Sequence, residues 1–152
     1  MPLSSDLREF VESLNSNGVE YLVVGAFAVA FYGCPRYTAD LDLLVNPTAE
    51  NARRVINALA QFGFGSVGVS PADLQSPGTV IQLGLKPNRI DLLTSISGVE
   101  FEEAWQGRKH ATLDGISVHY IGRKELIRNK EATGRARDLG DAEELRKRNH
   151  SN

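Results

Sequence analysis

Two segments carry apolar residues every three or four positions, which is the period of one helix face. The segment "SSDLREFVESLNSNG" has a serine to cap its start and Asn17-Gly18 to end it. The segment "TAENARRVINALAQFG" has the same pattern and ends at Gly63. Both segments are therefore predicted to be amphipathic helices that cover an apolar core.

Other segments have the short apolar runs or the alternation that are typical of strands. "VEYLVV" and "DLDLLV" are two such segments, and "TVIQLGL" and "RIDLLTSI" follow as a pair joined by a tight turn over "KPN". "RKHATLDGISVHYIG" is predicted to be a hairpin that turns at Asp114-Gly115, because an Asp-Gly pair favours the left-handed turn geometry of hairpins. The chain thus supplies several strands interleaved with helices.

The remaining segments complete the predicted fold. "GAFAVAFYG" is a short buried helix between Gly25 and Gly33, "VEFEEAWQG" is another short helix, and "FGSVGVSPADLQSPG" is a mobile loop with a short helical turn. Two closing helices, "GRKELIRNKEATG" and "RARDLGDAEELRKR", are separated by Gly134. We therefore predict the α/β (α+β) class, with a mixed sheet flanked by helices. Residues 1–152 are expected to form a single domain, with residues 146–152 as a frayed tail.

Composition narrows the function classes only slightly. The formal net charge is −2, so the chain has no general basic field, and any binding of nucleic acid requires a local patch. Cys34 is the single cysteine, which rules out a disulfide within the chain. No apolar run approaches the roughly 20 residues that span a bilayer, and the first residues lack the pattern of a secretory signal. We expect a cytoplasmic protein without a membrane partner.

Two carboxylates interrupt the apolar strand "DLDLLV". Side chains alternate across a strand, so Asp40 and Asp42 share one face and lie about 7 Å apart along it. Two acids at this distance repel each other unless a cation neutralises them, and carboxylate oxygens suit Mg²⁺ or Mn²⁺. Asp91 in "RIDLLTSI" points away from its apolar neighbours, so an adjacent strand brings it beside the pair. Three carboxylates can hold two divalent ions for in-line phosphoryl transfer, whereas a solvated strand edge is the simpler interpretation of the acidic pair alone.

The turn at Gly25, just before the short buried helix, offers a second candidate feature. A strand that enters a helix through glycine exposes the free N–H groups of the first helical turn, and these favour a phosphate. The alternative is a plain turn that needs glycine for its backbone geometry. For the turn taken alone, the plain turn is the favoured interpretation.

The stretch "YLVVGAFAVAFYGCPRYTADLDLLV" resembles the nucleotidyltransferase superfamily, which is built on a minimal polymerase-beta-like fold. The shared pattern is a strand ending in Gly-Gly or Gly-Ser, a short helix, a strand with Asp-x-Asp and a third acid on a later strand. The segments "PRYTADLD" and "NKEATGRARDLGDAEEL" are most similar to small bacterial proteins related to AbiEii-type abortive-infection toxins. The resemblance extends roughly from Val19 to Leu145.

This resemblance implies roles for individual residues. Asp40, Asp42 and Asp91 match the three catalytic carboxylates that bind metal, of which the third can also activate the attacking hydroxyl. The resemblance also implies a set of residues that bind the nucleotide or its phosphates: Gly25, Ala26, Arg36, Thr38, Lys130 and Arg135. Ala26 departs from the family pattern, since it keeps a backbone N–H but lacks the serine hydroxyl. For Lys130 and Arg135, solvated or ion-paired positions on the helix surface are the alternatives.

Two functions follow from the resemblance. The first is a metal-dependent nucleotidyltransferase that uses Mg²⁺ or Mn²⁺ and moves a nucleoside monophosphate from a nucleoside triphosphate (NTP) such as ATP to a hydroxyl acceptor. The acceptor would be tRNA or another RNA 3′ end, a protein or a small molecule, and a toxin–antitoxin or phage-defence role would add an antitoxin partner or a homo-oligomer. The second is a weakly active or inactive relative that binds a nucleotide, RNA or a partner. The acidic trio favours the first function, and Ala26 favours the second.

Overall fold

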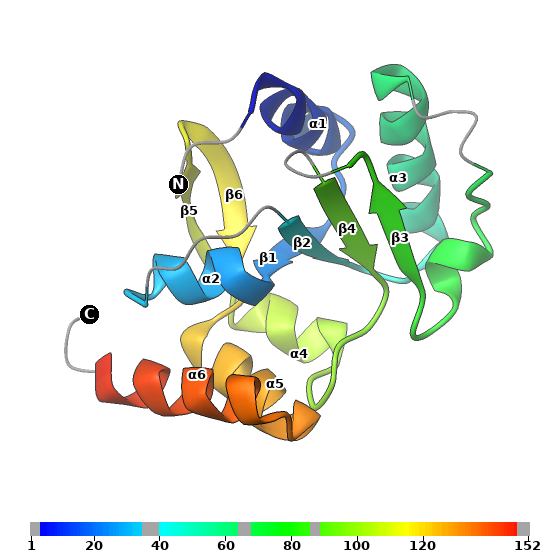
Figure 1. Cartoon of the computed structure of the whole chain (residues 1–152). Coiled ribbons are helices and arrows are strands. Elements are labelled where there is room, and N and C mark those ends of the chain that lie inside the picture. The colour runs from blue at the N-terminus through cyan, green and yellow to red at the C-terminus, as the bar shows by residue number, and fades with distance from the viewer. Residues whose placement is uncertain (1–3, 35–39, 64–67, 86–88, 149–152) are drawn as a thin grey trace.

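The computed structural model describes residues 4–34, 40–63, 68–85 and 89–148, which form a six-stranded mixed sheet with helices around it (Figure 1). The strands are β1 (Tyr21–Val24), β2 (Asp40–Val45), β3 (Val80–Leu83), β4 (Arg89–Leu93), β5 (Lys109–Leu113) and β6 (Ile116–Tyr120). The helices are α1 (Ser5–Ser16), α2 (Gly25–Phe31), α3 (Ala49–Phe62), α4 (Phe101–Gln106), α5 (Arg123–Thr133) and α6 (Ala136–Lys147), with a 3₁₀ turn η1 at Asp73–Gln75.

The strand order is β3-β4-β2-β1-β6-β5, so the sheet is not built in chain order. Strand β2 pairs antiparallel with β1 and parallel with β4, and β1 pairs parallel with β6. The pairs β3–β4 and β5–β6 are antiparallel and form the two edges. The acidic strands β2 and β4 are therefore direct neighbours near the middle of the sheet, which brings distant parts of the sequence together.

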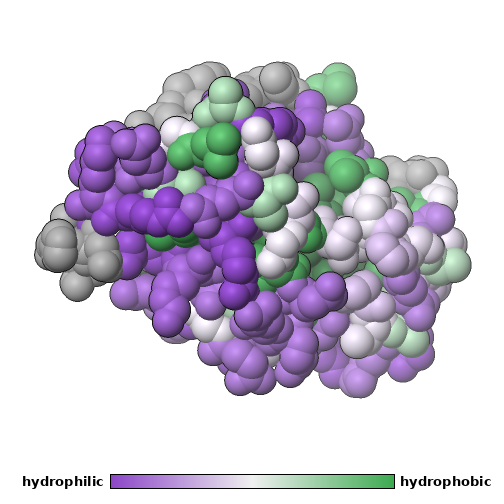
Figure 2. All heavy atoms as spheres, turned by 90° about the horizontal axis from the view of Figure 1, so that it is seen from below, coloured by the Kyte–Doolittle hydropathy of each residue, from purple (hydrophilic) through white to green (hydrophobic). Residues whose placement is uncertain are grey.

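The helices cover the sheet from different sides. Helices α1 and α3 lie side by side above the sheet in Figure 1, whereas α4, α5 and α6 lie below it, and α2 packs against β1 and β2. The face seen from below is covered largely by hydrophilic residues (Figure 2). In the part of the chain that the structure describes, no helix combines the length and the apolar character needed to cross a bilayer.

Local signals in the sequence account for the helix ends. The hydroxyl of Ser4 accepts a hydrogen bond from the backbone N–H of Leu7, and the hydroxyl of Thr48 accepts one from that of Asn51. These contacts satisfy N–H groups that have no partner inside the first turn of α1 and α3. Helix α3 ends at Gly63, whose φ of +96° is the left-handed conformation that glycine adopts without strain.

The predicted α/β (α+β) class and its mixed sheet are confirmed. The hairpin turns at Asp114-Gly115 and the loop before β3 contains the short turn η1, both as predicted. The chain enters α2 at Gly25 and leaves it through Gly33, whose φ is +99°, as predicted. One boundary was wrong: α6 continues to Lys147, so the expected tail does not begin at residue 146. The "KPN" turn and residues 149–152 lie outside the described residues.

Candidate active site

The three predicted carboxylates come from two neighbouring strands of the sheet. In the parallel pairing of β2 and β4, Asp42 lies directly opposite Asp91, and Asp40 lies opposite Arg89. The intervening Leu41 and Leu43 are fully buried on the other face. The alternation inferred from "DLDLLV" is therefore real, and the pairing of β2 with β4 places all three acids on one face of the sheet.

Arg89 occupies the space among these carboxylates. Its Nε donates a hydrogen bond to Asp91 Oδ1 and its Nη2 donates one to Asp91 Oδ2, each over 2.9 Å. The same Nε lies 3.8 Å from Asp40 Oδ1. This two-pronged geometry is the strong form of an arginine–carboxylate pair. The sequence pattern predicts no role for Arg89, although its position two residues before Asp91 puts both side chains on one face of β4.

Asp42 is held in an environment that disfavours its charge. Burial raises the pKa of Asp42 to about 6, and repulsion by Asp91 and Asp40 adds to this effect. Asp42 also packs tightly against Gly25, where an added Cβ atom would lie 2.3 Å from Asp42 Oδ2. Gly25 has a φ of +67°, so both backbone geometry and the close approach of the carboxylate require glycine here.

A cleft of about 290 Å³ opens beside this face of the sheet. Gly25 and Ala26 at the start of α2, Asp40 and Asp42 on β2, and a charged set from the two closing helices line it: Lys130, Arg135, Arg137 and Asp138. Asp91 is only 7% exposed and is not among these lining residues. The structure thus brings together most of the residues that the sequence predicted for the site.

Lys130 belongs to a buried ion network rather than to the solvated end of α5. Its side chain is only 12% exposed, and its Nζ lies 3.2 Å from Asp138 Oδ1 and 3.4 Å from Asp141 Oδ2. Thr133 and Arg135 donate hydrogen bonds of 2.7 and 2.8 Å to the other oxygen of Asp138. Although burial alone would raise the pKa of Asp138, these hydrogen bonds and the charge of Lys130 lower it below its usual value. The network fixes Lys130 at the wall of the cleft.

Replacement of Lys130 tests whether this network holds α5 against α6. Lys130→Met leaves the buried carboxylates of Asp138 and Asp141 without their shared cation, so we expect the free energy of unfolding to fall by about 2–3 kcal/mol. Urea unfolding measures this loss. The matched control is Lys147→Met, because Lys147 makes only exposed pairs with Glu143 and Glu144 and its loss should cost less than about 0.5 kcal/mol. Equal losses in the two variants would contradict the structural role of Lys130.

The other predicted residues have different outcomes. Arg36 and Thr38 lie outside the described residues. Arg135 lines the cleft, but its side chain is 76% exposed and pairs with Asp138, as one alternative had anticipated. Asp141 is buried and pairs with Lys130. Local sequence could not predict this burial, because Lys130 lies on the preceding helix.

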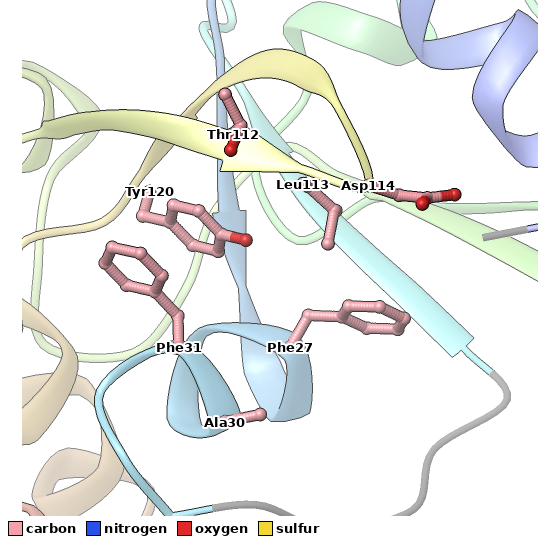
Figure 3. Close-up of a pocket in the computed structure, with 7 residues that line it drawn as sticks. All are labelled: Phe27, Ala30, Phe31, Thr112, Leu113, Asp114 and Tyr120. Atoms are coloured by element: carbon pink, nitrogen blue, oxygen red, sulfur yellow. The ribbon is translucent and has the colours of Figure 1, made fainter. Parts of the chain in front are cut away.

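A second cavity, of about 420 Å³, lies on the side of α2 that faces the β5–β6 hairpin (Figure 3). Phe27 and Phe31 point from α2 toward Tyr120 and Leu113, and the rings of Phe31 and Tyr120 stack with centroids 3.9 Å apart. This cavity is larger than the carboxylate cleft, but its lining is mainly apolar and includes a single carboxylate, Asp114. Size alone therefore does not mark the site, and charged groups converge only in the smaller cleft of these two.

A family model described as "Nucleotidyl transferase of unknown function (DUF2204)" matches residues 3–151. Among solved structures, a candidate nucleotidyltransferase from Thermotoga maritima is similar at 17% identity with a TM-score of 0.58, over 96% of this chain and 91% of that one. An antigenic nucleotidyltransferase-like protein from Paracoccidioides brasiliensis is 17% identical with a TM-score of 0.49, over 97% and 78%. No curated protein matches the sequence. At such identity, the likeness to the Thermotoga protein shows a shared fold.

Proposed function

Because the chain belongs to the DUF2204 family of nucleotidyl transferases, we propose that it moves a nucleoside monophosphate from an NTP to a hydroxyl acceptor. The observation that carries this proposal is the pairing of Asp42 opposite Asp91, with Asp40 on the same face of the sheet. Asp40 and Asp42 border a cleft that also contains the Gly25 turn and Lys130. These elements supply acidic groups for a metal and a cation for phosphate in one place.

The donor set suits Mg²⁺ or Mn²⁺, which prefer carboxylate oxygens. Asp40, Asp42 and Asp91 are the residues that would hold the metal. Burial is the main cause of the raised pKa of Asp42, repulsion by Asp91 and Asp40 adds to it, and a divalent ion would relieve that repulsion. Within the described ranges, no three acidic, histidine or cysteine side chains already converge as metal ligands, and Arg89 donates hydrogen bonds to both oxygens of Asp91. When bound, the metal neutralises the triphosphate and polarises the α-phosphate.

The residues around the cleft would then have separate roles in the transfer of the nucleotide. The acceptor oxygen forms a bond to the α-phosphorus, the bond from that phosphorus to the bridging oxygen breaks, and pyrophosphate leaves with the electron pair. Asp91 accepts the proton of the attacking hydroxyl. Lys130 and Arg135 would bind the triphosphate, and Gly25 and Ala26, which line the same cleft, would offer it their backbone N–H groups. Arg36 and Thr38 stay predictions of phosphate-binding residues.

We propose only the chemical class of the acceptor, which is a nucleophilic hydroxyl. An RNA 3′ end, including that of tRNA, a protein hydroxyl and a small molecule all provide one. The similarity of "PRYTADLD" to AbiEii-related proteins supports a toxin–antitoxin or phage-defence role. Such a role would bring an antitoxin or a second copy of the chain as a partner.

The proposal is tested by incubating the protein with each of the four α-labelled NTPs and Mg²⁺ or Mn²⁺ in the presence of total RNA, protein or small-molecule extracts. We expect label to move to one class of acceptor and the transfer to stop when EDTA is added. The control is the double variant Asp40→Asn and Asp42→Asn, which removes two of the three predicted ligands. Absence of transfer from every NTP to every class, with no stabilisation by metal, would reject the proposal.

A second candidate function is nucleotide binding without transfer. The bidentate contact of Arg89 with Asp91 favours it, because a carboxylate with both oxygens engaged is a poor base. In the same assay this candidate predicts that the protein binds an NTP with metal in calorimetry while no label moves. Detectable transfer excludes it.

A further inference from the structure

We propose that Arg89 is a resident cation of the carboxylate site, which a divalent metal ion must displace from Asp91 before it can bind. This inference rests on the proposed function, since it assumes that the three carboxylates are the metal ligands. It adds a role for Arg89 that neither the family match nor the three-acid pattern contains.

Arg89 already engages the oxygen atoms of Asp91 that would bind a metal ion. Both oxygens of Asp91 accept hydrogen bonds from Arg89, and these bonds are 2.9 Å long. A magnesium or manganese ion binds oxygen at about 2.1 Å, and here it would bind a carboxylate whose two oxygens Arg89 already engages. Because a guanidinium and a divalent ion on one carboxylate repel each other, Arg89 and the metal compete for Asp91.

Arg89 also lies between carboxylates of two different strands. Its backbone lies opposite Asp40 in the β2–β4 register, and its Nε reaches both Asp91 and Asp40. The side chain therefore bridges carboxylates from two strands, as a metal ion would. With Arg89 in place, one positive charge offsets part of the repulsion among the three acids, which stabilises the site without metal.

The side chain of Arg89 is more exposed to solvent than that of Asp91. Its side chain is 25% exposed, whereas that of Asp91 is 10% exposed. A long side chain at this exposure can rotate toward solvent while the aspartate stays fixed on β4. The ligand atoms are thus fixed, and the arginine is the movable part.

The test is binding of Mn²⁺ alone, without nucleotide, followed by electron paramagnetic resonance of the free ion. Arg89→Gln should bind Mn²⁺ roughly tenfold more tightly or better than the natural chain, because a competing unit charge is gone. Arg89→Lys should fall between them, since a lysine keeps the charge but cannot span both oxygens of Asp91. Arg54→Gln is the matched control, because it removes the same charge from an exposed pair with Glu50 on α3.

Thermal unfolding with EDTA and with Mn²⁺ guards against a folding defect. Arg89→Gln should melt below the natural chain in EDTA and gain more from Mn²⁺ than the natural chain does. If the natural chain and Arg89→Gln bind Mn²⁺ equally well, or if the variant binds more weakly, the inference fails while the proposed transferase stands. If neither binds Mn²⁺, even at millimolar concentration, the metal site and the proposed function fail with it.

Discussion

Asp42→Asn is expected to abolish nucleotidyl transfer and, at the same time, to make the metal-free protein more stable at neutral pH. Loss of a central metal ligand should lower the rate by about a thousandfold or more. The gain in stability follows from the raised pKa of Asp42, which is about 6 in the folded chain because the carboxylate is buried and faces Asp91 and Asp40. A folded-state pKa above the unfolded value means that ionisation of this group disfavours folding.

The sign of this effect sets its pH dependence. The protonated form of Asp42 favours the folded state fully below about pH 4, and this contribution is lost as the pH rises through about 6. Above that pH the natural chain carries a buried charge that the amide of Asn lacks. We expect Asp42→Asn to gain roughly 1–2 kcal/mol at pH 7.5, or about 3–6 °C in melting temperature, and to lose most of this advantage at pH 4.

Melting curves in EDTA at pH 4, 6 and 7.5, together with the transfer assay, measure both halves of this prediction. Glu12→Gln serves as the control, because Glu12 is an exposed carboxylate of α1, and its replacement should change neither stability nor transfer. An Asp42→Asn variant that is less stable than the natural chain at pH 7.5, or one that still transfers nucleotide, would contradict the arrangement.

Gly25→Ala is expected to reduce both stability and transfer, for two separable reasons. The φ of +67° at Gly25 costs an alanine about 1 kcal/mol. In addition, the new Cβ would lie 2.3 Å from Asp42 Oδ2, so the carboxylate has to move away from the cleft. We expect the free energy of unfolding to fall by about 2–4 kcal/mol and the transfer rate to fall roughly a hundredfold, because small displacements of a catalytic group are costly.

Gly78→Ala isolates the backbone part of this effect. Gly78 has a φ of +74°, close to that of Gly25, but an added Cβ there meets no atom within 4 Å. Urea unfolding should therefore show a loss of only about 1 kcal/mol for Gly78→Ala, with unchanged transfer. If both variants lose the same stability and both keep transfer activity, the close approach of Asp42 to Gly25 is not needed for stability or for transfer.

Local sequence patterns predicted most of the helices and strands, because each type of element spaces its apolar residues with a short, characteristic period. The side-chain caps at Ser4 and Thr48 and the left-handed conformation of Gly63 depend on residues only a few positions away. They could therefore be predicted from the local sequence. The alternation of acids and leucines from Asp40 to Val45 likewise fixed which side chains share a face. The wrong boundary, at the end of α6, falls where the terminal turn is governed by packing rather than by periodicity.

The sequence by itself determined the mixed α/β class, the acidic face of β2 and the candidate role of Asp91. Only the tertiary structure decided that Asp42 lies opposite Asp91, that Arg89 binds both oxygens of Asp91 and that Lys130 is held by carboxylates of α6. The physical reason is that periodicity is a property of one segment, whereas strand register and buried ion pairs depend on how distant segments pack. The same packing brings the carboxylate of Asp42 against Gly25, where an added Cβ would lie 2.3 Å from Asp42 Oδ2.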